Sequence, residues 1–285
     1  MTIRAHSGTI VSVGWYQPVG PPADLERLLA CSWTARPSGR HLLVPDGCID
    51  VLYESSGAVW ICGPETTAWT FVLPDNTVAV GVRFRPGAAP GVFGFDASTI
   101  RDRRIRFGEV RGRGGERALS SAVSRAISAG DDGGQSLRPG LDVLERAVRG
   151  IVGRRADNDE LAEKVLEFLA EFPRARQAAL AAHVGISSRQ LHRRSQQLFG
   201  FGIATLARLV RFQRLLSIAE TSPAAIPLAR LAVEAGYGDQ AHLGRDCRAI
   251  TGLAPVRFLA DYFPTFPTMS DPYKTNMPFV ATMAP

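Results

Sequence analysis

The residues with the clearest chemical potential are arginines in the C-terminal half of the chain. Twelve arginines and only four acidic residues stand between Phe172 and Phe258, so this stretch carries a formal charge of +8 while the whole chain carries +6. Arginine binds phosphate groups, and its planar fork can bond O6 and N7 of guanine together. The charge therefore suits a polyanionic partner, but charge alone is equally compatible with a solvated surface.

Two of these arginines belong to a repeated pattern. The first copy reads LAAHVGISSRQLHRR at 180–194, and the second reads LAVEAGYGDQAHLGR at 231–245. In both copies an alanine stands four positions before a glycine, and an arginine, Arg193 or Arg245, stands two positions after a later leucine. A further glycine follows nine positions after that leucine. Two copies with the same spacing are much more specific than one helical hairpin.

Each copy predicts two short helices joined by a tight turn. The alanine lets the helices cross closely, and Gly185 and Gly236 can adopt the positive φ that reverses the chain. Ser187 and Asp239 can cap the helix that follows the turn. The later leucine then points inward, so the arginine two positions on lies at least partly outward.

The two copies are joined by a predicted helix over residues 204–220. Apolar residues form one stripe along it, and Arg208, Arg211 and Arg214 occupy another face. We expect this helix to be a rod that holds the two units at a fixed distance, with Arg208 contacting phosphate or simply solvated. A further amphipathic helix precedes the first copy and ends at Pro173.

With its two copies and the helix between them, this part of the sequence resembles the DNA-binding domain of the AraC family. The stretch AGYGDQAHLGR at 235–245, followed by GLAP at 252–255, is similar to the family signature. The resemblance implies seven helices in two helix-turn-helix units, with the second helix of each unit in a major groove. The family usually has aromatic residues where this chain has Ser195 and Cys247. Ser195 therefore predicts a thinner core in the first unit or a shifted register there.

The resemblance and the helical period give nine candidate DNA-binding residues. They are Ser188, Arg189, His192, Arg193, Gln196, Gln240, Ala241, Arg245 and Arg248. By resemblance, Arg189 and Arg193 match base-contacting positions of the first unit, and Ala241 and Arg245 match those of the second. The alternative for each arginine is a surface residue in an i,i+4 ion pair. Arg248 is expected to contact phosphate or to be solvated.

The N-terminal part reads as β-rich. Short apolar runs separated by Pro, Gly and Asp predict strands at residues 41–44, 48–53, 59–62, 69–73 and 78–84. The expected fold class is α+β, with a β-rich sensor domain followed by an all-α domain. The motifs VPDGCID at 44–50, CGP at 62–64 and GVRFRPGA at 81–88 resemble a little-characterised N-terminal domain of some AraC-type regulators, which implies a regulatory role.

Asp46, Asp50 and Arg83 are the candidate effector-binding residues of this domain. In one interpretation Arg83 grips the carboxylate of a small effector, and in the other it forms a structural pair with an aspartate beside an Asp-Gly turn. Cys48 is a candidate thiol sensor or an inert buried thiol, because no cation stands beside it to lower its pKa. The histidines have no partner at ligand spacing, so no metal site is expected.

The predicted organisation has four parts. Residues 1–108 form the regulatory domain, and 109–156 form a helical connector and linker with helices near 116–128 and 140–150. Residues 157–263 form the double helix-turn-helix domain. Residues 264–285 hold five prolines and are predicted to be a disordered tail.

The sequence thus predicts a sequence-specific transcription regulator that reads two adjacent major grooves and is modulated through its N-terminal domain. Its expected partners are double-stranded DNA, RNA polymerase, a small-molecule effector and a second copy of the chain. It contains no GxSxG, HExxH or GKS/GKT motif and no GxGxxG after a strand, so no enzyme activity or cofactor is expected. A DNA-tethered enzyme, or a cysteine-based alkyl-transfer protein or thiol sensor, stays open as the alternative.

The remaining expectations concern the location of the protein in the cell and whether it activates or represses transcription. No apolar run reaches 18 residues and no signal peptide is seen, so a cytoplasmic protein with reduced thiols and no membrane contact is expected. Transcription activation is the working expectation, but the sequence leaves activation and repression open.

Overall fold

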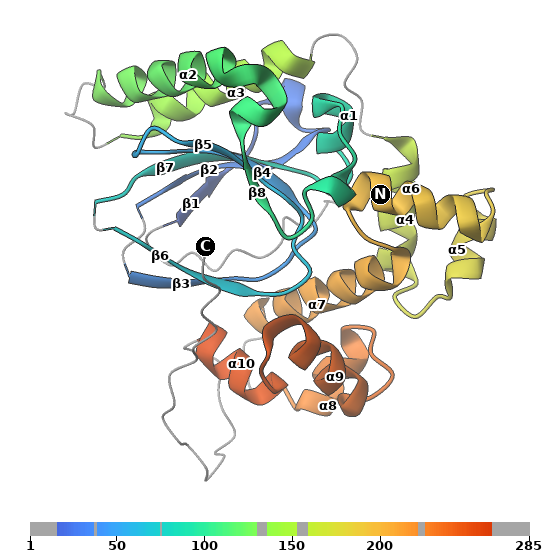
Figure 1. Cartoon of the computed structure of the whole chain (residues 1–285). Coiled ribbons are helices and arrows are strands. Elements are labelled where there is room, and N and C mark those ends of the chain that lie inside the picture. Colours follow the sequence, from blue (N-terminus) through green and yellow to red (C-terminus); the bar gives the residue numbers. More distant parts are fainter. Residues whose placement is uncertain are drawn as a thin grey trace.

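The computed structural model describes residues 16–36, 39–74, 76–129, 136–152, 159–221 and 226–263. The first part of the chain forms a six-stranded antiparallel sheet and a two-stranded one (Figure 1). The larger sheet has the order β1 (Tyr16–Val19), β2 (Leu29–Ala35), β7 (Ala79–Phe84), β4 (Ile49–Glu54), β5 (Val59–Cys62) and β8 (Arg104–Arg106). The smaller sheet pairs β3 (Gly39–Leu43) with β6 (Trp69–Leu73). The predicted tail, residues 264–285, lies outside the described residues.

The five predicted strands are present, and the structure adds β1, β2 and β8. Buried and partly exposed residues alternate along β4, and this period of two made the strand predictable from the sequence. β2 is buried at five of its seven positions, so its sequence LACSWTA shows no such alternation. β1 and β8 are edge strands of four and three residues, too short to give a period.

One face of the six-stranded sheet is covered by α2 (Phe107–Ser128) and α3 (Arg138–Val152) (Figure 1). Val82 and Phe84 of the sheet share one hydrophobic core with Val123 and Leu144 of these helices. The helices predicted as a connector therefore contribute to the core of the first domain. α2 is longer at its N-terminal end than predicted and changes direction at Gly112, whose φ is 78°.

Short helical elements connect strands of the larger sheet, one between β1 and β2 and two between β7 and β8. They are the 3-10 helix η1 (Ala23–Leu25), the helix α1 (Ala89–Phe93) and the 3-10 helix η2 (Ala97–Thr99). η2 packs against the end of the helix α6, which belongs to the second part of the chain. The two parts of the molecule thus touch each other directly.

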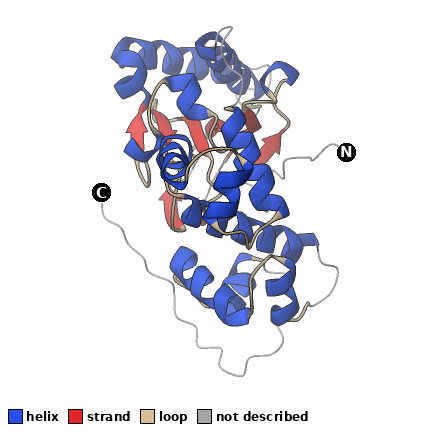
Figure 2. Cartoon of the chain, turned by 90° about the vertical axis from the view of Figure 1, so that its right-hand side faces the viewer, coloured by secondary structure: helices blue, strands red, loops and turns tan. Residues whose placement is uncertain are grey.

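Residues 159–221 and 226–263 form seven helices around a second core (Figure 2). They are α4 (Glu160–Glu171), α5 (Gln177–His183), α6 (Ser188–Phe199), α7 (Ile203–Thr221), α8 (Leu228–Glu234), α9 (Gln240–Thr251) and α10 (Pro255–Tyr262). The expected fold class, a β-rich domain followed by an all-α domain with a long connecting helix, is confirmed. No helix among the described residues has the length and apolar character that crossing a membrane requires.

Candidate nucleic-acid interface

The first helix-turn-helix unit consists of α5 and α6. Gly185 reverses the chain between them with a φ of 72°, as predicted. The Ser187 hydroxyl accepts a hydrogen bond from the backbone N–H of Gln190, and the Gln190 side chain accepts one from the backbone N–H of Ser187. This reciprocal capping fixes where α6 starts and therefore which of its residues face outward.

The second unit, α8 and α9, repeats this construction. Gly236 has a φ of 95°, and the Asp239 carboxylate caps α9 by accepting from the backbone N–H of His242. Tyr237, the residue after the turn glycine, is fully buried beneath the turn. The roles of Gly236 and Asp239 were predicted from residue type and spacing.

The two recognition helices have the same register. Each has twelve residues, follows its capping residue directly and ends at a left-handed glycine, Gly200 for α6 and Gly252 for α9. The missing aromatic at Ser195 does not thin the core, because the buried Phe199 and Phe201 fill it. The Ser195 hydroxyl donates to the carbonyl oxygen of Phe201 at 2.7 Å, so its polarity is satisfied inside the core.

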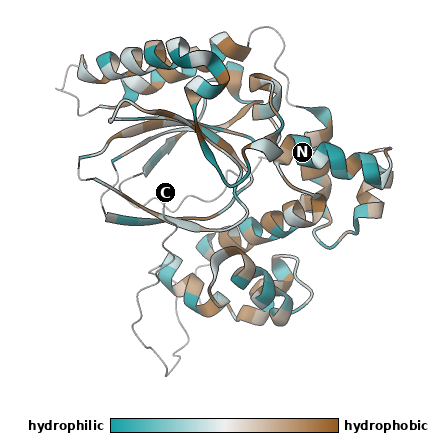
Figure 3. Cartoon of the chain, viewed as in Figure 1, coloured by the Kyte–Doolittle hydropathy of each residue, from teal (hydrophilic) through white to brown (hydrophobic). Residues whose placement is uncertain are grey.

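The predicted DNA-binding residues lie on the solvent side of α6 and α9. Eight of the nine are exposed, in the N-terminal halves of the helices or on the next turn, and Gln196 is half-buried. In the part of the chain that the structure describes, no hydrogen bond or ion pair engages the guanidinium groups of Arg189, Arg193 or Arg245. Figure 3 shows α6 as largely hydrophilic beside the more apolar α7. The i,i+4 pairing that was the alternative for these three arginines is therefore not formed.

Other predicted residues have partners within the chain. The backbone carbonyl of Ser188 accepts a hydrogen bond from the side-chain amide of Gln177, which braces α6 against α5. The Arg248 guanidinium folds back towards the carbonyl oxygen of Gly244 at 3.4 Å, a weak contact that leaves its side chain exposed. His192 lies close to Gly202, where an added Cβ would approach the imidazole to 3.0 Å.

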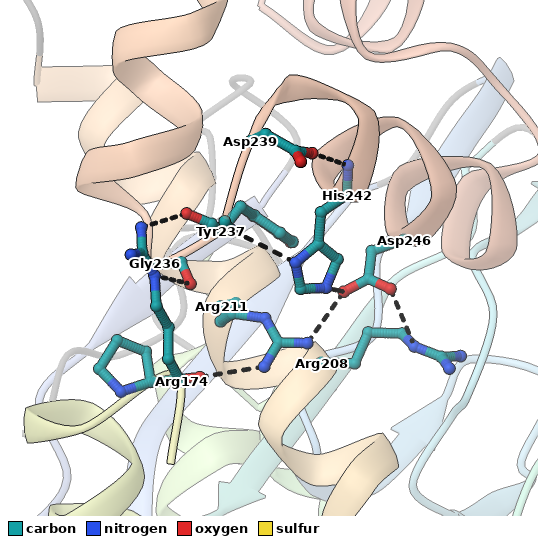
Figure 4. A network of polar contacts seen from close by, with 10 residues as sticks. Arg174, Arg208, Arg211, Gly236, Tyr237, Asp239, His242 and Asp246 are labelled. Atoms are coloured by element: carbon teal, nitrogen blue, oxygen red, sulfur yellow. Dashed lines mark hydrogen bonds and ion pairs between the residues drawn. The ribbon is translucent and has the colours of Figure 1, made fainter. Parts of the chain in front are cut away.

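Two arginines of the connecting helix bind an aspartate of α9. Arg208 forms an ion pair with Asp246 of α9 at 3.4 Å, so its side chain is not merely solvated, while its contact with phosphate stays a prediction. Arg211 binds the other oxygen of the same carboxylate at 3.0 Å, and His242 reaches it at 3.7 Å (Figure 4). Asp246 was not predicted as part of the interface, although an acidic residue inside such a basic helix signals that it needs a partner.

The same network joins the second unit to the start of the first one. Arg211 also donates to the carbonyl oxygen of Pro173, which precedes α5, at 3.0 Å. Arg174 donates to the carbonyl oxygens of Gly236 and Tyr237, in the turn of the second unit (Figure 4). The turn of one unit thus rests on the loop that leads into the other, and α7 is not the only connection between them.

The predicted effector residues of the first domain form an ion-pair cluster. Arg83 donates through Nε to both oxygens of Asp50, at 3.1 and 3.2 Å, and through Nη1 to Asp46 at 3.2 Å. The indole N–H of Trp33 donates to Asp50 at 2.9 Å. Burial raises the pKa of Asp50, while the Arg83 guanidinium opposes that shift. The arrangement agrees with the structural interpretation of the pair, in which Arg83 already has carboxylate partners.

The cysteines are poorly placed for thiolate chemistry. Burial raises the pKa of Cys48 well above its usual value, the pKa of Cys62 to about 12 and that of Cys247 to about 11. A reactive cysteine needs a lowered pKa, so these thiols do not support the alternative of a thiol sensor or alkyl acceptor. Among the described residues, no three His, Cys, Asp or Glu side chains gather in a way that could hold a metal ion.

Two family models match separate parts of the chain. Residues 180–261 match a family model described as a helix-turn-helix domain, and residues 17–106 match one described as a domain of unknown function (DUF6597). No curated relative matches the chain.

Solved structures of ToxT from Vibrio cholerae are similar over most of the chain. A 1.65 Å structure has a TM-score of 0.43 at 10% identity, covering 86% of this chain and 98% of that one. A structure from strain O395 has a TM-score of 0.42 at 11% identity, covering 86% and 97%. With its AraC-type helix-turn-helix domain at the C-terminus behind a DUF6597 domain, the chain has the architecture of a DNA-binding transcription regulator.

Proposed function

We propose that the protein reads two adjacent major grooves of double-stranded DNA with α6 and α9, and that its first domain modulates this binding. The observation that carries the proposal is the pair Arg193 and Arg245. They occupy equivalent positions on two helices of identical register, and both are exposed and unpaired within the described residues. The guanidinium of an exposed arginine without an internal partner can donate two hydrogen bonds to a guanine, one to O6 and one to N7.

The other residues have different tasks in this proposal. Arg189 joins Arg193 in reading bases in the first groove, and Gln240 joins Arg245 in the second. Ala241 cannot bond a base edge, but its methyl group suits contact with the methyl of thymine. Ser188, His192 and Gln196 contact the phosphates through hydrogen bonds, which position the protein, and Arg248 contacts them through its charge, which adds affinity and salt dependence. Sequence choice is left to the base readers.

The first domain contacts the C-terminal ends of both recognition helices. Arg101 donates to the carbonyl oxygen of Gly200 at 3.2 Å, and the backbone N–H of Ala68 donates to that of Ile250 at 2.6 Å. The last carbonyls of a helix have no partner within the helix, so donors from outside stabilise these ends. Pro64 also lies against Gly200, where an added Cβ would meet its ring at 2.6 Å.

One loop, residues 63–68, therefore reaches from the end of α6 to the end of α9. The Cα atoms of Pro64 and Ala68 can be at most about 14 Å apart, because an extended chain advances about 3.6 Å per residue. Successive major grooves are roughly 34 Å apart along one face of B-DNA. The loop is therefore shorter than the spacing of the grooves. We infer that it limits the separation between the C-terminal ends of α6 and α9, and that loosening it lets the two units move to the spacing of successive grooves.

Asp46, Asp50 and Arg83 are proposed as the place where a small effector acts on this restraint. We further propose a cytoplasmic location, recruitment of RNA polymerase at the bound site and pairing of two copies through the first domain. The location, the recruitment of RNA polymerase and the pairing rest on the helix-turn-helix match and on the resemblance to AraC-type regulators, and the effector site rests on the contacts between the two domains.

The test is selection of bound fragments from random DNA by the purified full chain. We expect a recovered motif of two blocks whose centres are about one helical turn apart, with guanine in both. Arg193→Ala is expected to blur the first block only, and Arg245→Ala the second only. A motif with a single block, or one that neither substitution alters, would contradict the two-groove proposal.

A further inference from the structure

We propose that a cavity between α2 and the turn that joins β4 to β5 binds the phosphate group of a small organic phosphate, and that Arg113 and Arg117 hold this group. None of the residues that line the cavity belongs to the DNA-reading surface or to the Arg83 cluster. The inference therefore goes beyond the proposed function and assigns a separate ligand site on the first domain.

The cavity has a volume of about 670 Å³, which lies within the range of pockets that bind small molecules. The β4–β5 turn is attached to α2 here, because the Ser120 hydroxyl donates to the carbonyl oxygen of Gly57 at 2.8 Å. Much of the lining comes from one face of α2, from this turn and from the end of β8: Arg113, Arg117, Ser120, Ser121, Gly57 and Arg106.

A change of direction in α2 closes one side of the cavity. Gly112 has a φ of 78°, which interrupts the helix, and the residues before it lie beside the regular helix that follows. Gly108 lies against Arg113, since an added Cβ on Gly108 would come within 3.4 Å of the Arg113 Cα atom. The backbone N–H of Gly108 also donates to the Glu116 carboxylate at 3.0 Å. The fold of the chain itself therefore fixes this wall.

The acidic residues of the cavity have partners within the chain. Glu116 is only 8% exposed and accepts hydrogen bonds from the Arg106 guanidinium as well as from Gly108. Glu109 accepts from the backbone N–H of Arg106 at 2.8 Å. Three arginines and two glutamates line the cavity, which leaves a net charge of +1. The cavity therefore attracts an anion, although two carboxylates lie in its wall.

Arg113 and Arg117 have no such internal partners. Both side chains are exposed, and no hydrogen bond or ion pair with another described residue engages either guanidinium. They stand one helical turn apart, where two like charges destabilise a helix, and an anion between them removes this repulsion. Arg189 and Arg193 of α6 show the same arrangement, and DNA is the anion proposed for them.

The donors of this helix face suit a phosphate group. A phosphate ester offers three terminal oxygens as acceptors, so it can bond both guanidinium groups at once. The Ser121 hydroxyl, one turn after Arg117, is exposed and has no hydrogen bond with the described residues, so it can donate to the third oxygen. A carboxylate offers one oxygen fewer. No covalent bond changes in this binding.

The position of the cavity favours a small molecule over a duplex. α2 lies at the opposite end of the molecule from α9 (Figure 1). The site is a hollow in the surface of the first domain, whereas α6 presents its arginines on the outside of a helix. We therefore expect a duplex bound to α9 to leave the cavity open to a small phosphate.

The experiment is isothermal titration calorimetry of the purified full chain with sodium pyrophosphate, in sodium chloride that keeps the ionic strength constant. We expect saturable binding. Arg113→Ala and Arg117→Ala should each weaken it by about tenfold, the factor that corresponds to one hydrogen bond to a charged group. Neither substitution should change Tm in the absence of pyrophosphate, because neither guanidinium has a partner among the described residues.

Two controls separate the cavity from other arginines of the chain. Arg125→Ala removes an exposed arginine of α2 that does not line the cavity. Arg193→Ala/Arg245→Ala removes two positive charges from the DNA-reading surface and matches the charge lost in Arg113→Ala/Arg117→Ala. Both controls should keep the pyrophosphate affinity of the wild type. The double variant of the cavity should bind the selected DNA as tightly as the wild type does.

Pyrophosphate binding that survives in Arg113→Ala/Arg117→Ala, or that falls equally in the control variants, would overturn the proposal. A fall in DNA affinity in the double variant of the cavity would also overturn it, because these arginines would then bind the nucleic-acid backbone. If no form of the chain binds DNA, the proposed function fails, whereas the calorimetry still tests the phosphate site by itself.

Discussion

Arg211 of α7 and Asp246 of α9 form an ion pair of 3.0 Å in which each side chain is only 12% exposed. Asp246 has a second arginine, Arg208, on its other oxygen, and Arg211 has a second acceptor in the carbonyl of Pro173. One buried carboxylate thus fixes the second recognition helix to the rod that leads from the first. The orientation of α9 depends on this pair as well as on apolar packing.

Replacing Asp246 by alanine should destabilise the helical domain strongly. Arg211 would keep its buried position without its carboxylate, and losing one partner of a buried pair typically costs roughly 3–5 kcal/mol. Thermal unfolding should show a clear fall in Tm. The control is Asp261→Ala, which breaks an exposed i,i+4 pair with Arg257 and should cost less than about 1 kcal/mol. Equal Tm changes in the two variants would show that the buried pair is not structurally important.

The two turn glycines should respond differently to alanine. Gly185 and Gly236 both have positive φ, which costs an alanine about 1–2 kcal/mol. An added Cβ at Gly185 meets nothing within 4 Å, whereas at Gly236 it comes within 2.6 Å of the Pro173 ring. Overpacking of this kind adds about 1–3 kcal/mol. Urea unfolding should therefore rank Gly236→Ala as clearly less stable than Gly185→Ala, and the reverse order would refute the contact with Pro173.

Arg193→Ala and Arg245→Ala should each weaken binding to the selected DNA by about 1–3 kcal/mol and relax the preference at one base pair. Neither should change Tm, because neither guanidinium has a partner among the described residues. Titration against DNA variants with single base changes measures both effects. Arg257→Ala, on α10 and paired with Asp261, serves as the matched loss of one positive charge. A specificity profile as sharp as that of the wild type would remove these arginines from base reading.

Glu65 should make the stability of the first domain depend on pH. Burial raises the pKa of Glu65 to about 7, although Arg104 pairs with it and opposes the shift. A folded-state pKa above the unfolded value of 4.5 means that the folded protein holds the proton more tightly. The stabilisation is fully present below about pH 4.5 and is lost as the pH rises through about 7. Tm of the wild type should therefore fall over this range more than that of Glu65→Gln, and parallel curves would exclude this role.

Local features of the helical domain were predictable because they depend on neighbouring residues. Gly185 and Gly236 at the turns, and Ser187 and Asp239 at the caps, stand where backbone geometry demands those residue types. The central strand β4 was predictable for the same reason, since its alternation reflects one buried face.

Long-range partners were not predictable from the sequence. Asp246 meets Arg208 and Arg211, some 35 positions away, only because α7 and α9 cross. Nothing in the spacing of Ala68 and Ile250 indicates that the first domain holds the end of α9.

The two helix-turn-helix units and their outward arginines follow from residue order alone, because helix period, turn and cap act within a few residues. The folded arrangement sets which arginines stay available and which are bound inside the protein. It also brings the carbonyl oxygen of Pro45 to the side-chain amide of Gln213 on α7. Those outcomes depend on distances between segments that are remote along the chain, and such distances are set by packing of the whole molecule.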